Sequence, residues 1–394
     1  MLSHEENKTV NSVSSDSYAW KSQRAWVEIN LAALSKNIAQ ICKLLGAKTQ
    51  FMAVVKADAY GHGAVSVAQT ALKAGASWLG VATVPEGIEL RKAGIKAPIL
   101  VLGATYTPEQ IEAIARWKLE ATICDCKQAL IFSDILETIN FDSPLRVHLK
   151  LDTGMSRLGT LWQDCSEFVQ LVASLPHLSI QSVYSHLATA DSPDRTVMDL
   201  QHQRFESAIA LLKDMGIEVP CLHLANSAGT LSDNSLHYDM VRVGLAIYGF
   251  YPSPHLRSTV ELQPVLEVKA RVTHVKTIEK GAGVSYGHTF VAAKQMRLAV
   301  VGIGYADGIP RNLSNKMQVL IRGVKISQIG TITMDQIMLD VSSIPDVGEG
   351  EIVTILGCEG AEQITAEDWS TQLNTISWEI LCSFKHRLPR VNVN

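Results

Sequence analysis

Short apolar runs alternate with longer amphipathic segments between residues 30 and 261, and this alternation constrains the fold more than any other feature. Eight of the runs have the length and apolar content of buried strands, and segments with helical spacing lie between them. The candidate strands are residues 51–55, 78–82, 99–102, 120–123, 146–151, 180–184, 221–224 and 238–243. Eight successive β-then-α units predict an α/β fold of the (β/α)8 TIM-like barrel type. A doubly wound open sheet, which normally has fewer strands at this length, is the alternative.

The chain beyond residue 261 has a different pattern. Short runs such as 297–304, 318–328 and 351–356 are alternating or continuously apolar, and Gly and Pro lie between them. This pattern predicts a mainly antiparallel β domain. We therefore expect a disordered extension at 1–23, a barrel domain at 24–261 and a C-terminal β domain at 262–394. The strand-like segment 25–29 can pair with either domain.

Composition narrows the class of protein. The 394 residues are 47% hydrophobic and 19% charged, which is typical of a globular protein, and the net charge of −4 gives no reason to expect nucleic-acid or membrane partners. The seven cysteines form no C-x-x-C pairs, so we expect reduced thiols and no metal site. The polar start lacks the apolar core of a secretory signal, and no run is long enough to span a bilayer. These features indicate a cytoplasmic protein.

One motif contains a candidate reactive group. Lys56 follows the apolar run 51–55 and precedes Ala-Asp-Ala-Tyr-Gly-His-Gly. The motif thus places an amine at the rim of a buried strand, beside a glycine-containing loop. Desolvation lowers the pKa of such an amine and so favours its neutral form, which is the form that makes an imine with a carbonyl cofactor. A strand-end lysine that only reaches water is the alternative interpretation of this segment.

Other polar residues stand at or just after the ends of later strands. They are Lys150, Arg157, Ser185, His186, Asn226, Ser227 and Arg242, and Gly244 follows the last of the strands. Because barrel enzymes place their chemistry at the carboxyl ends of the strands, we expect these residues to converge on one barrel mouth. An amine, hydroxyls, backbone N–H groups and an arginine together suit a phosphorylated aromatic aldehyde.

Six motifs in a fixed order give the chain a family resemblance. They are VKADAYGHG at 55–63, LDTGMSRLG at 151–159, VRVG at 241–244, VSYG at 284–287, GYADG at 304–308 and TMDQ at 333–336. With these motifs the chain resembles the alanine racemases, fold-type III enzymes that use pyridoxal 5′-phosphate (PLP). The resemblance runs from about residue 24 to residue 390. It implies an isomerase that interconverts L- and D-alanine for peptidoglycan synthesis.

The resemblance also implies roles for individual residues. Lys56 would hold PLP covalently and act as one catalytic base, and Tyr286 from the β domain of a second subunit would act as the other. The implied cofactor-binding residues are Tyr60, His186, Asn226, Ser227, Arg242, Gly244, Leu245 and Trp378. The implied substrate-binding residues are Arg157, Tyr305, Met334 and Asp335. Lys150 is a position that family members often carbamylate, with an ordinary ion-paired lysine as the alternative. The enzyme would be a homodimer with shared active sites.

The chemistry of racemisation agrees with these roles. A proton must leave Cα on one face and return on the other, which calls for two bases on opposite sides. An arginine at the cofactor's ring nitrogen, here Arg242, would leave that nitrogen unprotonated and disfavour transamination. A decarboxylase of the same fold type would instead have an acidic residue there and a Gly-rich phosphate loop. A protein that only carries PLP would not need the second domain with Tyr286.

The chain departs from the family at Trp378, where members usually have a tyrosine. Tryptophan keeps an N–H donor but is bulkier and cannot accept a hydrogen bond. This change affects a phosphate contact and the entrance to the site. A serine racemase, or a racemase of several small amino acids, is therefore the alternative function.

Overall fold

The computed structural model describes residues 22–393, so most of the extension expected at 1–23 lies outside the described residues. The chain forms two compact units. The barrel unit contains Ile29–Leu266 and Ser377–Cys382. The β unit contains Glu267–Ile376, Ser383–Val391 and the described residues up to Glu28.

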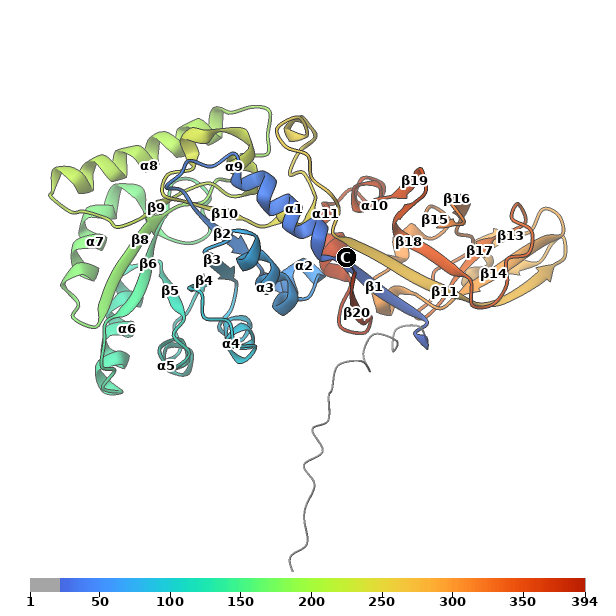
Figure 1. The fold of residues 1–394 in the computed structure, drawn as a ribbon, viewed down its shortest axis with the longest axis horizontal. Coiled ribbons are helices and arrows are strands. Elements are labelled where there is room, and N and C mark those ends of the chain that lie inside the picture. The colour runs from blue at the N-terminus through green and yellow to red at the C-terminus, as the bar shows by residue number, and fades with distance from the viewer. Residues whose placement is uncertain (1–21, 394) are drawn as a thin grey trace, which may run out of the picture. The chain divides into compact units, whose positions relative to one another are not determined.

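Eight parallel strands form the centre of the barrel unit (Figure 1). They are β2 (Gln50–Val54), β3 (Trp78–Val81), β4 (Ile99–Ala104), β5 (Glu120–Ile123), β6 (Leu145–Asp152), β8 (Leu178–Tyr184), β9 (Leu222–His223) and β10 (Met240–Val243). The sheet runs in the order β10-β2-β3-β4-β5-β6-β8-β9. Two further bonds, from Asp239 N to Leu222 O and from Arg242 N to Ala225 O, each 3.0 Å, link the outermost strands and nearly close the barrel. The predicted (β/α)8 barrel is confirmed.

Helices lie outside these strands and bury one face each (Figure 1). They are α1 (Leu31–Cys42), α3 (Ala64–Ala74), α4 (Val84–Lys92), α5 (Pro108–Arg116), α6 (Cys126–Thr138), α7 (Cys165–Ser174) and α8 (Thr196–Asp214). The shorter elements of the unit are α2 (Lys56–Gly61), β7 (Thr160–Leu161), α9 (Ser227–Ser232) and α11 (Ser377–Ser383). Side-chain caps begin several helices; the Asp125 carboxylate, for example, accepts from Gln128 N at the start of α6.

The β unit is built on a long strand, β11 (Leu266–Ile278), whose first seven residues alternate between buried and half-buried. This alternation is what an antiparallel sheet with one face in the core requires. The other strands are β1 (Ala25–Asn30), β14 (Met296–Val301), β15 (Gln318–Ile321), β16 (Val324–Ser327), β17 (Ile337–Asp340), β18 (Ile352–Glu359), β19 (Glu362–Ile364) and β20 (Arg390–Val393). A separate ribbon of β12 (Gly283–Val284) and β13 (Phe290–Val291) and the helix α10 (Ala366–Leu373) complete the unit. The predicted mainly antiparallel domain is confirmed.

The chain passes from the barrel unit to the β unit between Leu266 and Glu267, where the sequence predicted 261/262, and two segments distant from this point also belong to the other unit. β1 lies between β11 and β20 in the β sheet, so most of the segment 25–29 joins the β unit. Ser377–Cys382, which contains Trp378, joins the barrel unit. In both cases a segment pairs or packs with residues that are far away in the sequence. The order of apolar and polar residues within a segment does not predict such contacts.

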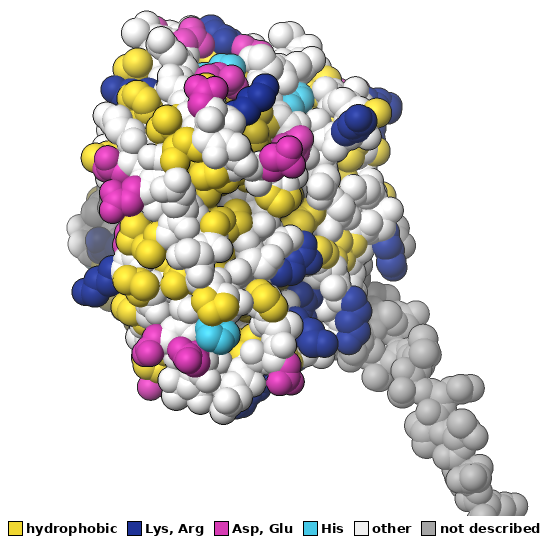
Figure 2. All heavy atoms as spheres, turned by 90° about the vertical axis from the view of Figure 1, so that its left-hand side faces the viewer, with side chains coloured by type: hydrophobic (Ala, Val, Ile, Leu, Met, Phe, Trp, Pro, Cys, Tyr) yellow, Lys and Arg dark blue, Asp and Glu magenta, His cyan; other side chains and the backbone are white. Residues whose placement is uncertain are grey.

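The surface mixes side chains of all kinds. On the face shown in Figure 2, acidic and basic groups are interspersed with apolar ones. Across residues 22–393, no helix is both long and apolar enough to cross a bilayer.

Candidate active site

Lys56 lies two residues beyond the last residue of β2 and begins a left-handed turn. The next four residues, Ala57 to Tyr60, have φ between 52° and 56°, which makes this a left-handed turn built from residues with side chains. Each such residue costs roughly 1–2 kcal/mol in this conformation. Surrounding contacts must therefore hold the turn in place.

Two carboxylates supply those contacts. Glu86 Oε1 accepts from Ala57 N at 2.8 Å, and its Oε2 accepts from Ala82 N and Thr83 N at 2.7 and 3.0 Å. Asp58 Oδ1 accepts from the backbone N–H that begins α3, at 2.8 Å. Glu86 was not among the residues expected in the site. Its signal in the sequence is the Thr-x-x-Glu capping box at the start of α4, which the structure confirms.

The turn directs the buried Tyr60 side chain towards Gly244. A Cβ on Gly244 would lie 2.6 Å from Tyr60 Oη, so only glycine allows this close approach. Ser227 Oγ lies beside them and accepts from Gly244 N at 3.0 Å and from Ala246 N at 3.4 Å. Burial raises the pKa of Tyr60, so its hydroxyl stays a donor. Hydroxyl and backbone donors thus gather in one place, as recognition of a phosphate requires.

Three other residues expected near this cluster lie in the same unit. Asn226 caps α9, and its side chain accepts from Gly229 N at 3.0 Å. Leu245 is buried immediately after Gly244. Trp378 is half-buried on α11.

Arg242 is buried at the end of β10 and its guanidinium is fixed by four acceptors. It donates to His223 Nδ1 at 2.9 Å and to His186 Nδ1 at 3.2 Å. It also donates to the carbonyls of Ser185 and Leu224 at 2.8 and 3.1 Å. Burial lowers the pKa of Arg242 to about 10, which still leaves it charged at neutral pH. The side chain is therefore a cation in one orientation.

Positive groups dominate this barrel mouth. Burial lowers the pKa of His186 well below its usual range, and the charges of Arg242, Lys150, Arg157 and Lys56 lower it further. Burial also lowers the pKa of Lys56, and the Arg157 guanidinium acts in the same direction. These mutual effects show that Lys56, Lys150, Arg157, His186 and Arg242 lie close enough to influence one another. They also favour a neutral amine at Lys56.

Lys150 lies deeper in the barrel. Its Nζ sits 4.3 Å from the centre of the Tyr184 ring and its side chain is buried. Burial, followed by the charge of Arg242, lowers the pKa of Lys150 to about 7. The neutral form of this amine is therefore favoured far more than in an exposed lysine.

Tyr286 belongs to the β unit and its side chain is 69% exposed. The backbone around it is held firmly. Thr331 Oγ1 donates to Tyr286 O and Ser285 Oγ donates to Thr331 O, both at 2.7 Å. The phenol therefore projects from an anchored loop into solvent in the single chain.

The remaining predicted residues lie together elsewhere in the β unit. Tyr305 N donates to Thr333 O, and the next N–H donates to Met334 O, each at 3.0 Å. Tyr305 and Met334 are exposed. Asp335 pairs with Arg387 at 2.5 Å, a contact that the sequence does not predict.

Family models identify relatives of both parts of the chain. The model described as "Alanine racemase, N-terminal domain" matches residues 29–252, and "Alanine racemase, C-terminal domain" matches residues 265–392.

Individual proteins are similar over nearly the whole chain. The alanine racemase of Nostoc sp. is 71% identical over 378 residues, which cover 96% of this chain and 98% of that protein. The alanine racemase of Synechocystis sp. is 59% identical over 369 residues, or 94% of this chain and 99% of that one. Among solved structures, the alanine racemase of Clostridium difficile 630 has a TM-score of 0.90 at 34% identity, covering 94% of this chain and 96% of its own. The alanine racemase of Bacillus anthracis with bound L-Ala-P has a TM-score of 0.88 at 34% identity, covering 94% and 95%.

Proposed function

The chain belongs to the alanine racemase family, and we propose that it interconverts L- and D-alanine with two bases, Lys56 and Tyr286, and with PLP as cofactor. Membership of this family makes the chain an isomerase. The observation that carries the mechanism is the placement of Lys56. It begins a strained turn that ends with Tyr60, whose side chain reaches Gly244 beside Ser227.

The residues of the barrel mouth fit PLP. The Lys56 amine, with its lowered pKa, suits attachment to the aldehyde. The hydroxyls of Tyr60 and Ser227, with the backbone at Gly244 and Leu245, would hold the phosphate. Arg242 would meet the ring nitrogen as a charged donor, which leaves that nitrogen unprotonated and disfavours transamination. Bound PLP draws electrons from the substrate's Cα and so makes its proton acidic.

Two bases then handle that proton. Lys56 Nζ accepts or returns it on one face of Cα, and Tyr286 Oη does so on the other. Arg157 and the backbone of Met334 hold the substrate carboxylate, with Tyr305 and Asp335 beside it. His186, already bonded to Arg242, would link the guanidinium to Tyr286.

We propose that Tyr286 acts in the barrel of a second copy, so that the enzyme is a homodimer with shared active sites. Support comes from the β unit, where Tyr286, Tyr305 and Met334 are large side chains left exposed in the single chain. The proposed enzyme works in the cytoplasm and supplies D-alanine for peptidoglycan.

We also propose that Lys150 is carbamylated. Its neutral amine, abundant near pH 7, forms an N–C bond with CO2 and releases one proton, which leaves a carbamate anion. The charges of Arg242 and Arg157 reach Lys150 and disfavour an ammonium there. The positive charges of Arg242 and Arg157 stabilise an anion at this position. The carbamate on Lys150 would in turn hold the Arg157 guanidinium in place.

Proton exchange in deuterated water tests the function. L-alanine and L-serine are offered separately to the purified holoenzyme, NMR follows loss of the α-proton, and a chiral assay identifies the product. Rapid exchange with D-alanine formed, and little exchange with serine, is expected. Comparable serine turnover would assign a broader specificity to the site with Trp378, an alternative that the similar proteins do not favour. No exchange with either, despite bound PLP, would overturn the proposal.

A further inference from the structure

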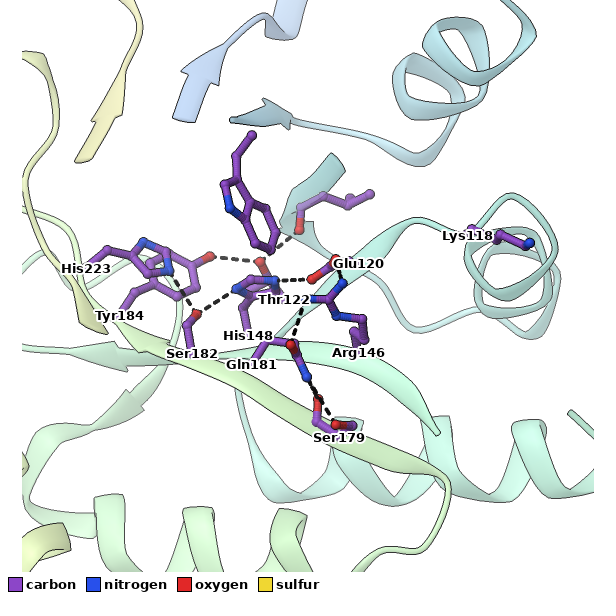
Figure 3. A network of polar contacts seen from close by, with 12 residues as sticks. Lys118, Glu120, Thr122, Arg146, His148, Ser179, Gln181, Ser182, Tyr184 and His223 are labelled. Carbon is purple, nitrogen blue, oxygen red and sulfur yellow. Dashed lines mark hydrogen bonds and ion pairs between the residues drawn. The ribbon is translucent and has the colours of Figure 1, made fainter. Parts of the chain in front are cut away.

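A line of polar side chains crosses the interior of the barrel from β5 to β10, with all its members buried. Glu120 Oε2 lies 2.7 Å from His148 Nε2, and His148 Nδ1 lies 2.6 Å from Ser182 Oγ. Ser182 Oγ lies 2.8 Å from His223 Nε2, and His223 Nδ1 lies 2.9 Å from Arg242. Figure 3 shows the part from Glu120 to His223. The line thus joins a carboxylate to the guanidinium at the barrel mouth.

The two ends determine where every proton lies. Arginine can only donate, so His223 Nδ1 must accept. Burial and the charge of Arg242 hold the pKa of His223 well below its usual range, so this ring is neutral with its proton on Nε2. Ser182 Oγ accepts a hydrogen bond from His223 Nε2–H, and the Ser182 hydroxyl donates its proton to His148 Nδ1. His148 then donates from Nε2 to the Glu120 carboxylate. All four hydrogen bonds therefore run in one direction.

The strands and neighbouring rings keep the line in place. His148 and Ser182 are directly paired in the register of β6 with β8. The His148 ring meets Trp78 edge-on at 5.4 Å, and the His223 ring stacks on Tyr184 at 4.5 Å with an angle of 4° between planes. Neither imidazole is free to rotate and exchange its two nitrogens.

The far end is anchored as an anion. Glu120 Oε1 pairs with Arg146 at 3.2 Å, and the Arg146 side chain is 49% exposed. This contact leaves Glu120 Oε2 as the acceptor for His148. A charged donor thus stands at one end of the line and a charged acceptor at the other, which polarises the bonds between them.

We propose that Glu120, His148, Ser182 and His223 are positioning residues for Arg242. Glu120, His148 and Ser182 hold His223 in the tautomer whose Nδ1 accepts from the Arg242 guanidinium. This contact fixes the orientation of the guanidinium and therefore the direction of its other N–H groups. This inference rests on the proposed function, in which Arg242 faces the ring nitrogen of PLP. None of the four residues touches the reacting atoms.

The first test needs no substitution. In ¹⁵N NMR of the histidine-labelled holoenzyme, His148 and His223 are both expected with protonated Nε2 and unprotonated Nδ1. Assignment uses His148→Gln and His223→Gln. A wild-type His223 with its proton on Nδ1, or a His148 protonated on both nitrogens, would overturn the proposal whatever the activity. The expected tautomers in a protein that does not racemise alanine would overturn the proposed function and leave the line of hydrogen bonds intact.

The second test breaks the line at its centre. Ser182→Ala removes the one oxygen that joins the two rings, so His148 Nδ1 loses its donor and His223 Nε2 loses its acceptor. We expect kcat to fall about 10-fold to 100-fold, as for other partners that orient a catalytic group, with KM for alanine changed less than about 2-fold. The ¹⁵N pattern of His148 should change in the same protein. Ser182→Thr, which keeps the hydroxyl, should restore the wild-type pattern.

Ser133→Ala is the matched control. Ser133 is also a buried serine whose hydroxyl meets a histidine, His177, at 3.4 Å, but it lies on α6 outside the barrel interior. This variant should keep the wild-type kcat and the wild-type tautomers of His148 and His223. A Ser182→Ala enzyme with the same kcat as Ser133→Ala would contradict a positioning role.

Discussion

The two units present their functional side chains in opposite ways. In the barrel unit, Arg242 and Lys150 are 3% and 6% exposed, and Arg242 is fixed by hydrogen bonds. In the β unit, Tyr286 and Met334 are 69% and 52% exposed, and only their backbones are held. The barrel therefore organises its site within one chain. In the proposed mechanism, the exposed side chains of the β unit need a second surface before they can work.

The largest expected effect comes from the barrel side of this comparison. Lys56→Ala removes both the proposed attachment point for PLP and one of the two proposed bases. Racemisation should therefore fall more than ~1,000-fold, and the absorbance of the attached cofactor should disappear. Chiral assay and absorbance spectroscopy measure the two effects. Lys73→Ala, a change at an exposed lysine on α3, is the control and should alter neither. Retention of the cofactor band in Lys56→Ala would contradict the assigned role.

The second prediction concerns the internal support of the β unit. The buried Asp307 carboxylate accepts from Arg24 at 2.6 and 2.9 Å and from Gly304 N at 2.9 Å. Asp307→Ala removes these acceptors, and we expect unfolding free energy to drop by about 2–3 kcal/mol. Urea denaturation measures the loss. The exposed pair of Asp335 with Arg387 is the comparison, because Asp335→Ala should cost less than about 1 kcal/mol. Equal losses in the two variants would show that Asp307 gives no special support.

A pH dependence of stability is expected in the barrel. The pKa of Lys150 is about 7 in the folded chain, below its ordinary value of 10.5, because of burial. Between these values the unfolded chain binds more protons, so the lysine makes stability rise with pH by up to about 1.4 kcal/mol per unit. Lys150→Met should remove this slope in CO2-free buffer, as measured by denaturation at pH 7, 8 and 9. Parallel stability curves for both proteins would contradict the shift.

The sequence predicts the barrel well because buried parallel strands are continuous apolar runs. The expected strand at 120–123 coincides with β5, whereas 221–224 shortens to β9 (Leu222–His223). The left-handed turn after Lys56 was not predictable, since it depends on the Glu86 carboxylate from another helix. Polar residues inside apolar strands, such as His148, were visible in the sequence. Their connection was not, because strand register places His148 opposite Ser182.

In the proposed dimer, the exposed Tyr286 completes the barrel site of another copy. Lys56→Ala and Tyr286→Phe chains, each nearly inactive alone, can be mixed, dissociated and reassembled. Tyr286→Phe should keep the cofactor absorbance while losing most racemisation, by ~100-fold or more. Random pairing makes half of the dimers mixed, each with one intact site of two, so about a quarter of the wild-type activity should return. Activity no greater than that of the separate variants would contradict a shared site.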